Sequence, residues 1–300
     1  MAFDLRRLRY FVAVAEEGHI TRASERLGIQ QAPLSLQIKT LERELDARLF
    51  RRHAKGVEMT DAGRALLAEA RAVLARTVEA EAAVRRAARG EAGRIRIGFT
   101  NSAWVHPATS AAIRAFRAAA PQVGLSFDQA GTSGLIERLQ SGAVDVAFIR
   151  TAPARPEGLQ LHRLAEEPMV AALPAGHPLA APDAPVALAS LADETFVGYP
   201  RTEGAGLYDA IIAACHACGF SPQIGHETPQ MIATLSLVAA GLGVSIVPAS
   251  LTRLQLDGVA YRPLAGLVLP RAELNLATRR GEPSAAVQRF LEIATRTAAR

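Results

Sequence analysis

Cysteine, lysine and aromatic residues are all scarce in this sequence of 300 residues. Only two cysteines are present, which excludes a disulfide framework and agrees with a reducing cytoplasm. Aromatic residues make up 5% of the chain and alanine is abundant, which favours helices over a β-sandwich. A chain of this length predicts two or three folding units rather than one simple core.

Apolar runs of the kind found in signal peptides and membrane spans are also lacking. Near the start, an apolar run ends after six residues at Glu16 and Glu17, which is too short for a signal peptide. The segment Met231–Thr252 is uncharged and long enough to span a bilayer, but it contains Gly241 and Pro248. We predict for it a helix, a glycine turn and a buried strand. The protein is therefore expected to be soluble and cytoplasmic, with no membrane partner.

The formal net charge of +5 is concentrated in the first 90 residues. This segment holds 17 Lys and Arg against 12 Asp and Glu, while the remaining 210 residues hold 17 of each. Both lysines, Lys39 and Lys55, lie in it. A basic module joined to a neutral one predicts that the N-terminal part binds a polyanion. Charge alone leaves DNA, RNA and a membrane surface open.

Three helices are predicted near the N-terminus. Apolar residues repeat at three and four over residues 4–17, as on one face of an amphipathic helix. Thr21 is predicted to cap a second helix that Gly28 ends, and Pro33 suits the first turn of a third helix running to about Asp46. Two short helices, a glycine-containing turn and a third polar-faced helix are the layout of a helix-turn-helix.

The third helix and the segment after it supply the candidate DNA-binding residues. Outward glutamine, serine, lysine and arginine side chains suit base edges and phosphates, and basic residues around Gly56 predict a hairpin wing. The alternatives are a solvated helix face and an exposed charged loop. Double-stranded DNA is favoured because the charge, the capped helices and the turn occur together. The candidates are Thr21, Gln30, Gln31, Pro33, Ser35, Leu36, Lys39, Arg43, Arg52 and Lys55.

Residues 61–89 are predicted to form one long helix, because they contain no proline and a single glycine, Gly63. Small and apolar residues recur in steps of four and three from Leu66 to Ala87, which is the a/d pattern of a helix seam. A helix with such a stripe needs a partner. We expect homodimerisation, which matches two-fold symmetric operators; the alternative is packing against the chain's own domain.

The N-terminal 65 residues resemble the LysR-type transcriptional regulators. The matching segments are Leu8–Ala15, Ala23–Leu27, Gln31–Glu42, Leu49–Arg52 and Thr60–Gly63. Two residues depart from the family pattern: Ala32 replaces the usual proline and Leu36 a frequent arginine, so no operator sequence is carried over. The resemblance implies a winged helix-turn-helix, homodimers that associate into homotetramers, and contact with RNA polymerase.

Strand and helix patterns alternate after residue 91. Strands are predicted at 94–99, 125–128 and 144–149, and a second α/β set runs from about 168 to 262. The chain then returns with a strand at 273–278 and a closing helix at 285–297. This order predicts a mostly parallel α/β sheet. The family resemblance implies two lobes like those of periplasmic binding proteins, joined by two crossovers.

The expected fold class is therefore α/β: an N-terminal winged helix-turn-helix and a long linker helix, then a two-lobed periplasmic-binding-protein-like effector domain. Residues 1–60 are assigned to DNA binding, 61–90 to the linker and dimerisation helix, and 91–300 to the effector-binding domain. Within that domain, lobe one covers about 91–163 and 267–300, and lobe two about 164–266.

Loops that follow the predicted strands are rich in small polar residues. Ligands of open α/β sheets bind where such loops meet helix N-termini, and free N–H groups there favour an anion such as a carboxylate. Each Ser or Thr taken alone is explained equally well as a helix cap. The loop pattern resembles that of the branch of the family that responds to muconates, benzoate and chlorocatechol-derived acids. This resemblance implies a small organic acid as effector. The candidates are Thr100, Asn101, Ser102, Thr132, Ser133, Arg150, Pro200, Arg201, Thr202 and Thr228.

Other chemistries have little support in the sequence. Cys215 and Cys218 form a lone C-x-x-C inside a predicted helix, which is interpreted as structural or incidental. Nucleophile-elbow, Walker and dinucleotide-binding motifs are missing from the sequence, so no catalytic residue, cofactor or metal is expected. The alternatives are a solute-binding protein, which would need a signal peptide, and an enzyme on the same lobes, which would need convergent acid and base residues.

Overall fold

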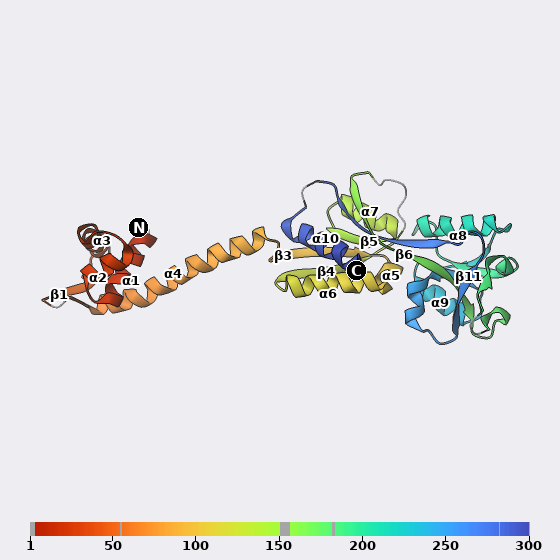
Figure 1. Cartoon of the computed structure of the whole chain (residues 1–300), viewed down its shortest axis with the longest axis horizontal. Coiled ribbons are helices and arrows are strands. Elements are labelled where there is room, and N and C mark those ends of the chain that lie inside the picture. The colour runs from red at the N-terminus through yellow and green to blue at the C-terminus, as the bar shows by residue number, and fades with distance from the viewer. Residues whose placement is uncertain are drawn as a thin grey trace. The chain divides into compact units, whose positions relative to one another are not determined.

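The computed structural model describes residues 4–54, 56–150, 157–181, 184–203, 205–281 and 283–299. The chain divides into two compact units, Met1–Arg85 and Arg86–Arg300. Figure 1 labels the elements of each unit.

The first unit is a helical domain with a two-stranded hairpin. Asp4 caps the first helix by accepting a hydrogen bond from the N–H of Arg6, and Gly18, at φ 61°, ends it in the left-handed conformation. The core forms around Phe11, whose ring lies 5.3 Å from that of Phe50. The elements are α1 (Leu5–Glu17), α2 (Ile20–Leu27), α3 (Gln31–Glu44), β1 (Phe50–His53), β2 (Gly56–Met59) and α4 (Asp61–Ala88).

The cap of α2 differs from the prediction. The sequence predicted Thr21 as its N-cap, but α2 begins at Ile20, and Nδ1 of His19 accepts the N–H of Thr21 at 3.2 Å. A histidine nitrogen can replace a hydroxyl as the acceptor, which the usual capping preferences do not favour. Gly28 ends α2 at φ 64°, and Pro33 lies in the first turn of α3, both as predicted.

Helix α4 is the long helix predicted from residue 61, and it is unbroken over 28 residues. Near its start, Leu66 and Ala70 pack into the core of the first unit. This part of the predicted seam therefore contacts the chain's own domain, which was the alternative interpretation. Farther along, Val73 and Val84 are 39% and 70% exposed, so the rest of the stripe has no partner within the described part of one chain.

The second unit is built on a long mixed sheet with the order β4-β3-β5-β12-β6-β11-β7, to which β10 is added through β6. Strand β3 is parallel to β4 and β5, as the alternating pattern predicted, but β12 and β6 add antiparallel pairs. The strands are β3 (Gly93–Phe99), β4 (Val123–Gln129), β5 (Val146–Ile149), β6 (Leu159–Pro174), β7 (Val186–Ala187), β8 (Thr195–Gly198), β9 (Gln223–Glu227), β10 (Ser245–Pro248), β11 (Val259–Ala265) and β12 (Arg271–Arg279).

Strand β6, which the sequence patterns did not predict, crosses from one lobe to the other. From Leu159 to Pro168 it pairs with β12, and from Met169 its partners are β10 and β11. A second crossover joins β11 to β12. Lobe one contains β3, β4, β5, α5, α6, α7 and α10, and lobe two contains β7 to β11 with α8 and α9 (Figure 1). The two-lobed α/β fold is thus confirmed.

Each lobe has its own core. In lobe one, Phe290 contacts Phe116 and Phe148 edge to face, and α6 and α10 lie side by side against the sheet (Figure 1). In lobe two, Leu235 of α9 and Val247 of β10 are fully buried. The helices of the unit are α5 (Asn101–Val105), α6 (Pro107–Ala119), α7 (Thr132–Gln140), α8 (Ala205–Ala217), α9 (Met231–Ala239) and α10 (Ala285–Ala298).

The uncharged segment Met231–Thr252 contains α9, a turn with Gly241 and Gly243 in positive-φ conformations, and β10. The predicted helix, glycine turn and buried strand are confirmed. Among the described residues, no helix combines the length and the apolar character needed to cross a bilayer.

Candidate functional site

The outer face of α3 carries most of the residues predicted to bind DNA. Leu34, Ile38 and Leu41 are buried and hold the helix against the core of the first unit. With its apolar side fixed in this way, the helix turns the opposite side outward. The predicted residues found exposed there are Gln30, Gln31, Pro33, Leu36, Lys39 and Arg43.

Two hydrogen bonds connect this face to its neighbours. The hydroxyl of Thr21 donates to Oε1 of Gln31 at 3.2 Å, and Nη2 of Arg52, on strand β1, donates to the hydroxyl of Ser35 at 2.9 Å. Strands β1 and β2 form the predicted hairpin wing. Lys55 lies outside the described residues. The structure therefore brings together four of the predicted residues from α2, α3 and the wing.

A buried carboxylate that the sequence reasoning missed fastens the wing to α3. Oε1 of Glu42 accepts the backbone N–H groups of Leu49 at 2.8 Å and Phe50 at 3.2 Å. Its side chain lies on the buried, otherwise apolar face of α3, where a glutamate is rarely found without a partner. The sequence does contain a signal for this role, because the helical repeat places the charged residue Glu42 on the buried face of α3.

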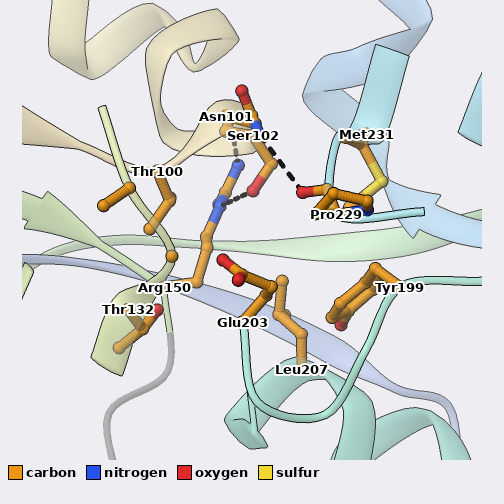
Figure 2. A pocket seen from close by; sticks show the side chains of 12 residues that line it. Thr100, Asn101, Ser102, Thr132, Arg150, Tyr199, Glu203, Leu207, Pro229 and Met231 are labelled. Atoms are coloured by element: carbon orange, nitrogen blue, oxygen red, sulfur yellow. Dashed lines mark hydrogen bonds between the residues drawn. The ribbon is translucent and has the colours of Figure 1, made fainter. Parts of the chain in front are cut away.

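In the second unit, a pocket of about 40 Å³ lies between the two lobes (Figure 2). This volume holds a few water molecules. Loops that begin α5 and α7 contribute the side from lobe one, and the segments before α8 and α9 contribute the side from lobe two. The lining residues are Thr100, Asn101, Ser102, Ala130, Gly131, Thr132, Arg150, Tyr199, Glu203, Leu207, Pro229 and Met231.

Arg150 is the centre of a buried polar network at this pocket, and its side chain is 2% exposed. Nε donates to the hydroxyl of Ser102 at 3.0 Å and Nη2 to its carbonyl at 2.8 Å. Nη1 lies 2.7 Å from Oε1 of Glu167, which also accepts the hydroxyl of Ser250 at 3.0 Å. Burial lowers the pKa of Arg150 and the charge of Glu167 opposes this change. Glu167 therefore compensates the arginine charge within the protein.

Three polar atoms of the lining lack a hydrogen-bond partner: Oγ1 of Thr100, the hydroxyl of Tyr199, and Nη1 of Arg150, whose ion pair with Glu167 lacks hydrogen-bond alignment. Thr100 and Tyr199 are each 7% exposed. Burial raises the pKa of Tyr199 above its ordinary value, and the charge of Arg150 opposes this. Buried polar atoms are almost always paired in folded proteins, so these atoms are suited to receive a ligand or ordered water.

The lining contains half of the residues predicted to bind the effector: Thr100, Asn101, Ser102, Thr132 and Arg150. The others lie outside it. Arg201 is exposed and its Nε donates to Oδ1 of Asp209 at 2.7 Å, so its charge is already paired at the surface. The remaining residues outside the lining are Ser133, Pro200, Thr202 and Thr228. Sequence reasoning missed Tyr199, Glu203 and Glu167, because a strand pattern does not reveal which distant loops share a cleft.

The cysteine pair lies at the end of α8, and both thiols are free. Burial raises the pKa of Cys215 to about 11, which keeps this thiol protonated and unreactive at neutral pH. In the part of the chain that the structure describes, no three His, Cys, Asp or Glu side chains are grouped to hold a metal ion.

Two family models match the chain on either side of the long helix. Residues 5–64 match the helix-turn-helix of the lysR family of bacterial regulatory proteins. Residues 88–299 match the LysR substrate binding domain. The chain belongs to the LysR family of transcriptional regulators. Its helix-turn-helix is therefore a DNA-binding module, and its two-lobed unit is the effector-binding domain of this LysR-type regulator.

Curated relatives cover nearly the whole chain. It is 42% identical over 265 residues to the "Uncharacterized HTH-type transcriptional regulator YnfL" of Escherichia coli K12, covering 88% of this chain and 89% of the relative. It is 38% identical over 290 residues to the HTH-type transcriptional regulator BudR of Raoultella terrigena, covering 97% of this chain and 99% of the relative.

Solved structures of LysR-type regulators are similar to the whole chain or to its effector-binding domain. Full-length CbnR complexed with its target DNA has a TM-score of 0.85 at 27% identity, covering 99% of this chain and 100% of that one. The effector binding domain of BenM with its effector benzoate has a TM-score of 0.60 at 28% identity, covering 69% of this chain and 92% of that one.

Proposed function

We propose that this regulator recognises specific operator sequences through the outer face of α3 and the β1–β2 wing, and that a small acid bound between its lobes changes its activity. The observation that carries this proposal is the polar and cationic face of α3, held outward by a buried core and fastened to a basic hairpin. All relatives reported above are named as transcriptional regulators, so no catalytic activity is proposed.

The proposed effector carries a carboxylate group and belongs to the aromatic or dicarboxylic acids, with a role in aromatic catabolism. Nη1 of Arg150, which forms an ion pair with Glu167 but makes no aligned hydrogen bond, and the hydroxyl of Thr100 are donors that suit a carboxylate oxygen. The fold similarity to the benzoate-bound domain of BenM supports an aromatic acid. The effector residues proposed are the five found in the lining together with the five predicted residues outside it: Ser133, Pro200, Arg201, Thr202 and Thr228.

The proposed assembly is a homodimer formed along α4, which associates further into a homotetramer in the cytoplasm. The exposed valines of α4 support a partner helix, since a small-residue seam allows close approach. Residues 1–60, 61–90 and 91–300 are the proposed DNA-binding, linker and effector-binding domains. Effector shifts the equilibrium between two lobe arrangements by its difference in affinity for them, and this changes how the paired DNA-binding units engage DNA and RNA polymerase.

Selection of bound DNA from a pool of random duplexes tests whether the protein recognises a specific operator sequence. The variant Arg43→Ala tests whether the outer face of α3 contacts the DNA. Arg43 lies near the end of α3, where side chains reach phosphates rather than base edges. We expect the variant to weaken binding to selected and random duplexes alike, and to reduce the slope of log affinity against log salt by about one. The exposed Arg117→Ala on α6 is the matched control and should bind as wild type. An unchanged salt slope for Arg43→Ala would contradict its assignment.

Leu36 is expected to read a thymine methyl group, because it is a large apolar side chain left 62% exposed on the recognition face. Apolar side chains contact the thymine C5-methyl in the major groove. Replacing the contacted thymine by uracil should weaken wild-type binding about fourfold, the value of one buried methyl, and leave Leu36→Ala unaffected. Scanning each thymine of the selected duplex by uracil substitution checks this. Equal sensitivity in both proteins would show that another residue makes the contact.

A further inference from the structure

A second acidic side chain, Glu203, reaches the pocket from lobe two. It lies in the turn after β8, where its N–H donates to the carbonyl of Pro200 at 2.9 Å. Figure 2 shows its carboxylate turned into the pocket, towards Arg150 of lobe one. The sequence prediction for this loop had instead selected its neighbours at 200, 201 and 202.

Contacts across the cleft fix the position of Glu203. Its carbonyl accepts the N–H of Thr132, at the start of α7, at 2.8 Å. Gly131 makes this approach possible, since a Cβ there would overlap Oε2 of the Glu203 carboxylate and would lie 2.5 Å from the Glu203 carbonyl oxygen and 2.9 Å from its Cα. Gly131 has an ordinary negative φ that any residue can adopt. Glycine is therefore needed at this position because Glu203 packs closely against it, and not because of its backbone conformation.

Among the described residues, the charged side chains around the pocket leave the carboxylate of Glu203 without an ion-pair partner. Arg150 is paired with Glu167 at 2.7 Å, so this couple contributes no net charge. Within the described part of the chain, Glu203 has no cation within 4 Å. The same pocket is therefore lined by this carboxylate and by the unpaired hydroxyls of Thr100 and Tyr199. A plain carboxylate ligand would satisfy Arg150 and Thr100, but it would bring a second negative charge close to Glu203.

We propose that Glu203 is a specificity-determining residue that makes the pocket select acids carrying an additional hydrogen-bond donor, an ammonium or hydroxyl group. This inference rests on the effector site of the proposed function and narrows its ligand class. The carboxylate of the ligand faces Arg150 and Thr100, and its donor group faces the carboxylate of Glu203. Unsubstituted acids are rejected because they leave Glu203 unpaired and repelled.

Matched ligand sets test this assignment in the full-length protein. The sets are benzoate, 2-hydroxybenzoate and 2-aminobenzoate; succinate, malate and aspartate; and propionate, lactate and alanine. Titration calorimetry on wild type is expected to show, in at least one set, a substituted acid bound about tenfold more tightly than its unsubstituted parent, as for one hydrogen bond to a charged group. In Glu203→Gln this ratio should fall to about threefold or less. Glu227→Gln, an exposed glutamate on β9 outside the lining, is the control and should keep the wild-type ratio.

Two results would overturn the proposal. One is a ratio in Glu203→Gln equal to that of wild type, and the other is no binding of any substituted acid to wild type. The selected duplex is titrated with the same preparations. Retained DNA binding together with either result rejects only the ligand class, whereas loss of DNA binding in wild type contradicts the proposed function itself. An unchanged thermal transition of ligand-free Glu203→Gln shows that the variant is folded.

Discussion

Replacing Glu167 by glutamine is expected to destabilise the effector-binding domain by about 3–5 kcal/mol, the usual cost of removing one partner of a buried ion pair. The substitution leaves the Arg150 charge buried and uncompensated. It also places an amide beside the backbone N–H of Ser250, which donates to Oε2 of Glu167 at 2.5 Å. Urea unfolding followed by the fluorescence of Trp104, the single tryptophan of the chain and a residue of lobe one, measures the effect.

The neighbouring residue provides a control. Glu166 forms ion pairs with Arg163 and Arg271, but its side chain is 28% exposed and those of the arginines are 53% and 56% exposed. Surface pairs contribute about 0–1 kcal/mol, so Glu166→Gln should change the unfolding midpoint little. Equal losses for the two variants would show that Glu167 is not the compensating charge of the cleft.

Gly63→Ala is expected to destabilise the first unit by about 1–3 kcal/mol or more, the cost of overpacking. Gly63 is buried in the first turn of α4, and a Cβ there would overlap the carbonyl oxygen of Leu49 and lie 3.2 Å from its carbon. The backbone just before β1 cannot move away, because the N–H of Leu49 is held by Glu42. Thermal unfolding followed by circular dichroism, together with affinity for the selected duplex, checks both stability and the placement of the wing.

Replacing Gly134 by alanine is expected to stabilise the protein rather than destabilise it. Gly134 occupies the third position of α7, as Gly63 does in α4. The atom nearest to a new Cβ at Gly134, however, is the Cβ of Ala130, at an ordinary contact distance of 3.4 Å. Alanine there gains helix propensity of up to about 1 kcal/mol. Destabilisation of equal size at both sites would indicate that close approach to Leu49 is not the reason for glycine at position 63.

Local patterns predicted most elements of the fold. The ends of α1 and α2, the first turn of α3 and the unbroken α4 follow from glycine, proline and apolar spacing within a few residues. The prediction failed for the cap of α2, where a histidine acts in place of the expected threonine. It also missed β6, because this strand extends over both lobes and its alternation changes where its partners change.

The candidate pocket was predicted in part, for a related reason. Residues that follow strands β3 and β5 were identified because the carboxyl ends of parallel strands meet at one edge of a sheet. Glu167 and Glu203 were not, since their roles depend on contacts with residues far away in sequence. Arg201 was selected over Glu203 because its charge suits an anion, but only the folded turn shows that Arg201 points to Asp209 at the surface.

Strand β6 limits how this regulator can be re-engineered as a biosensor. One continuous strand of 16 residues belongs to both lobes, and Glu167 lies on it two residues before its partners change. Exchanging a whole lobe with that of another regulator would cut this strand close to Glu167, the counter-charge of Arg150. New inducer responses are therefore better obtained by point changes in the loops around Glu203 than by recombining modules.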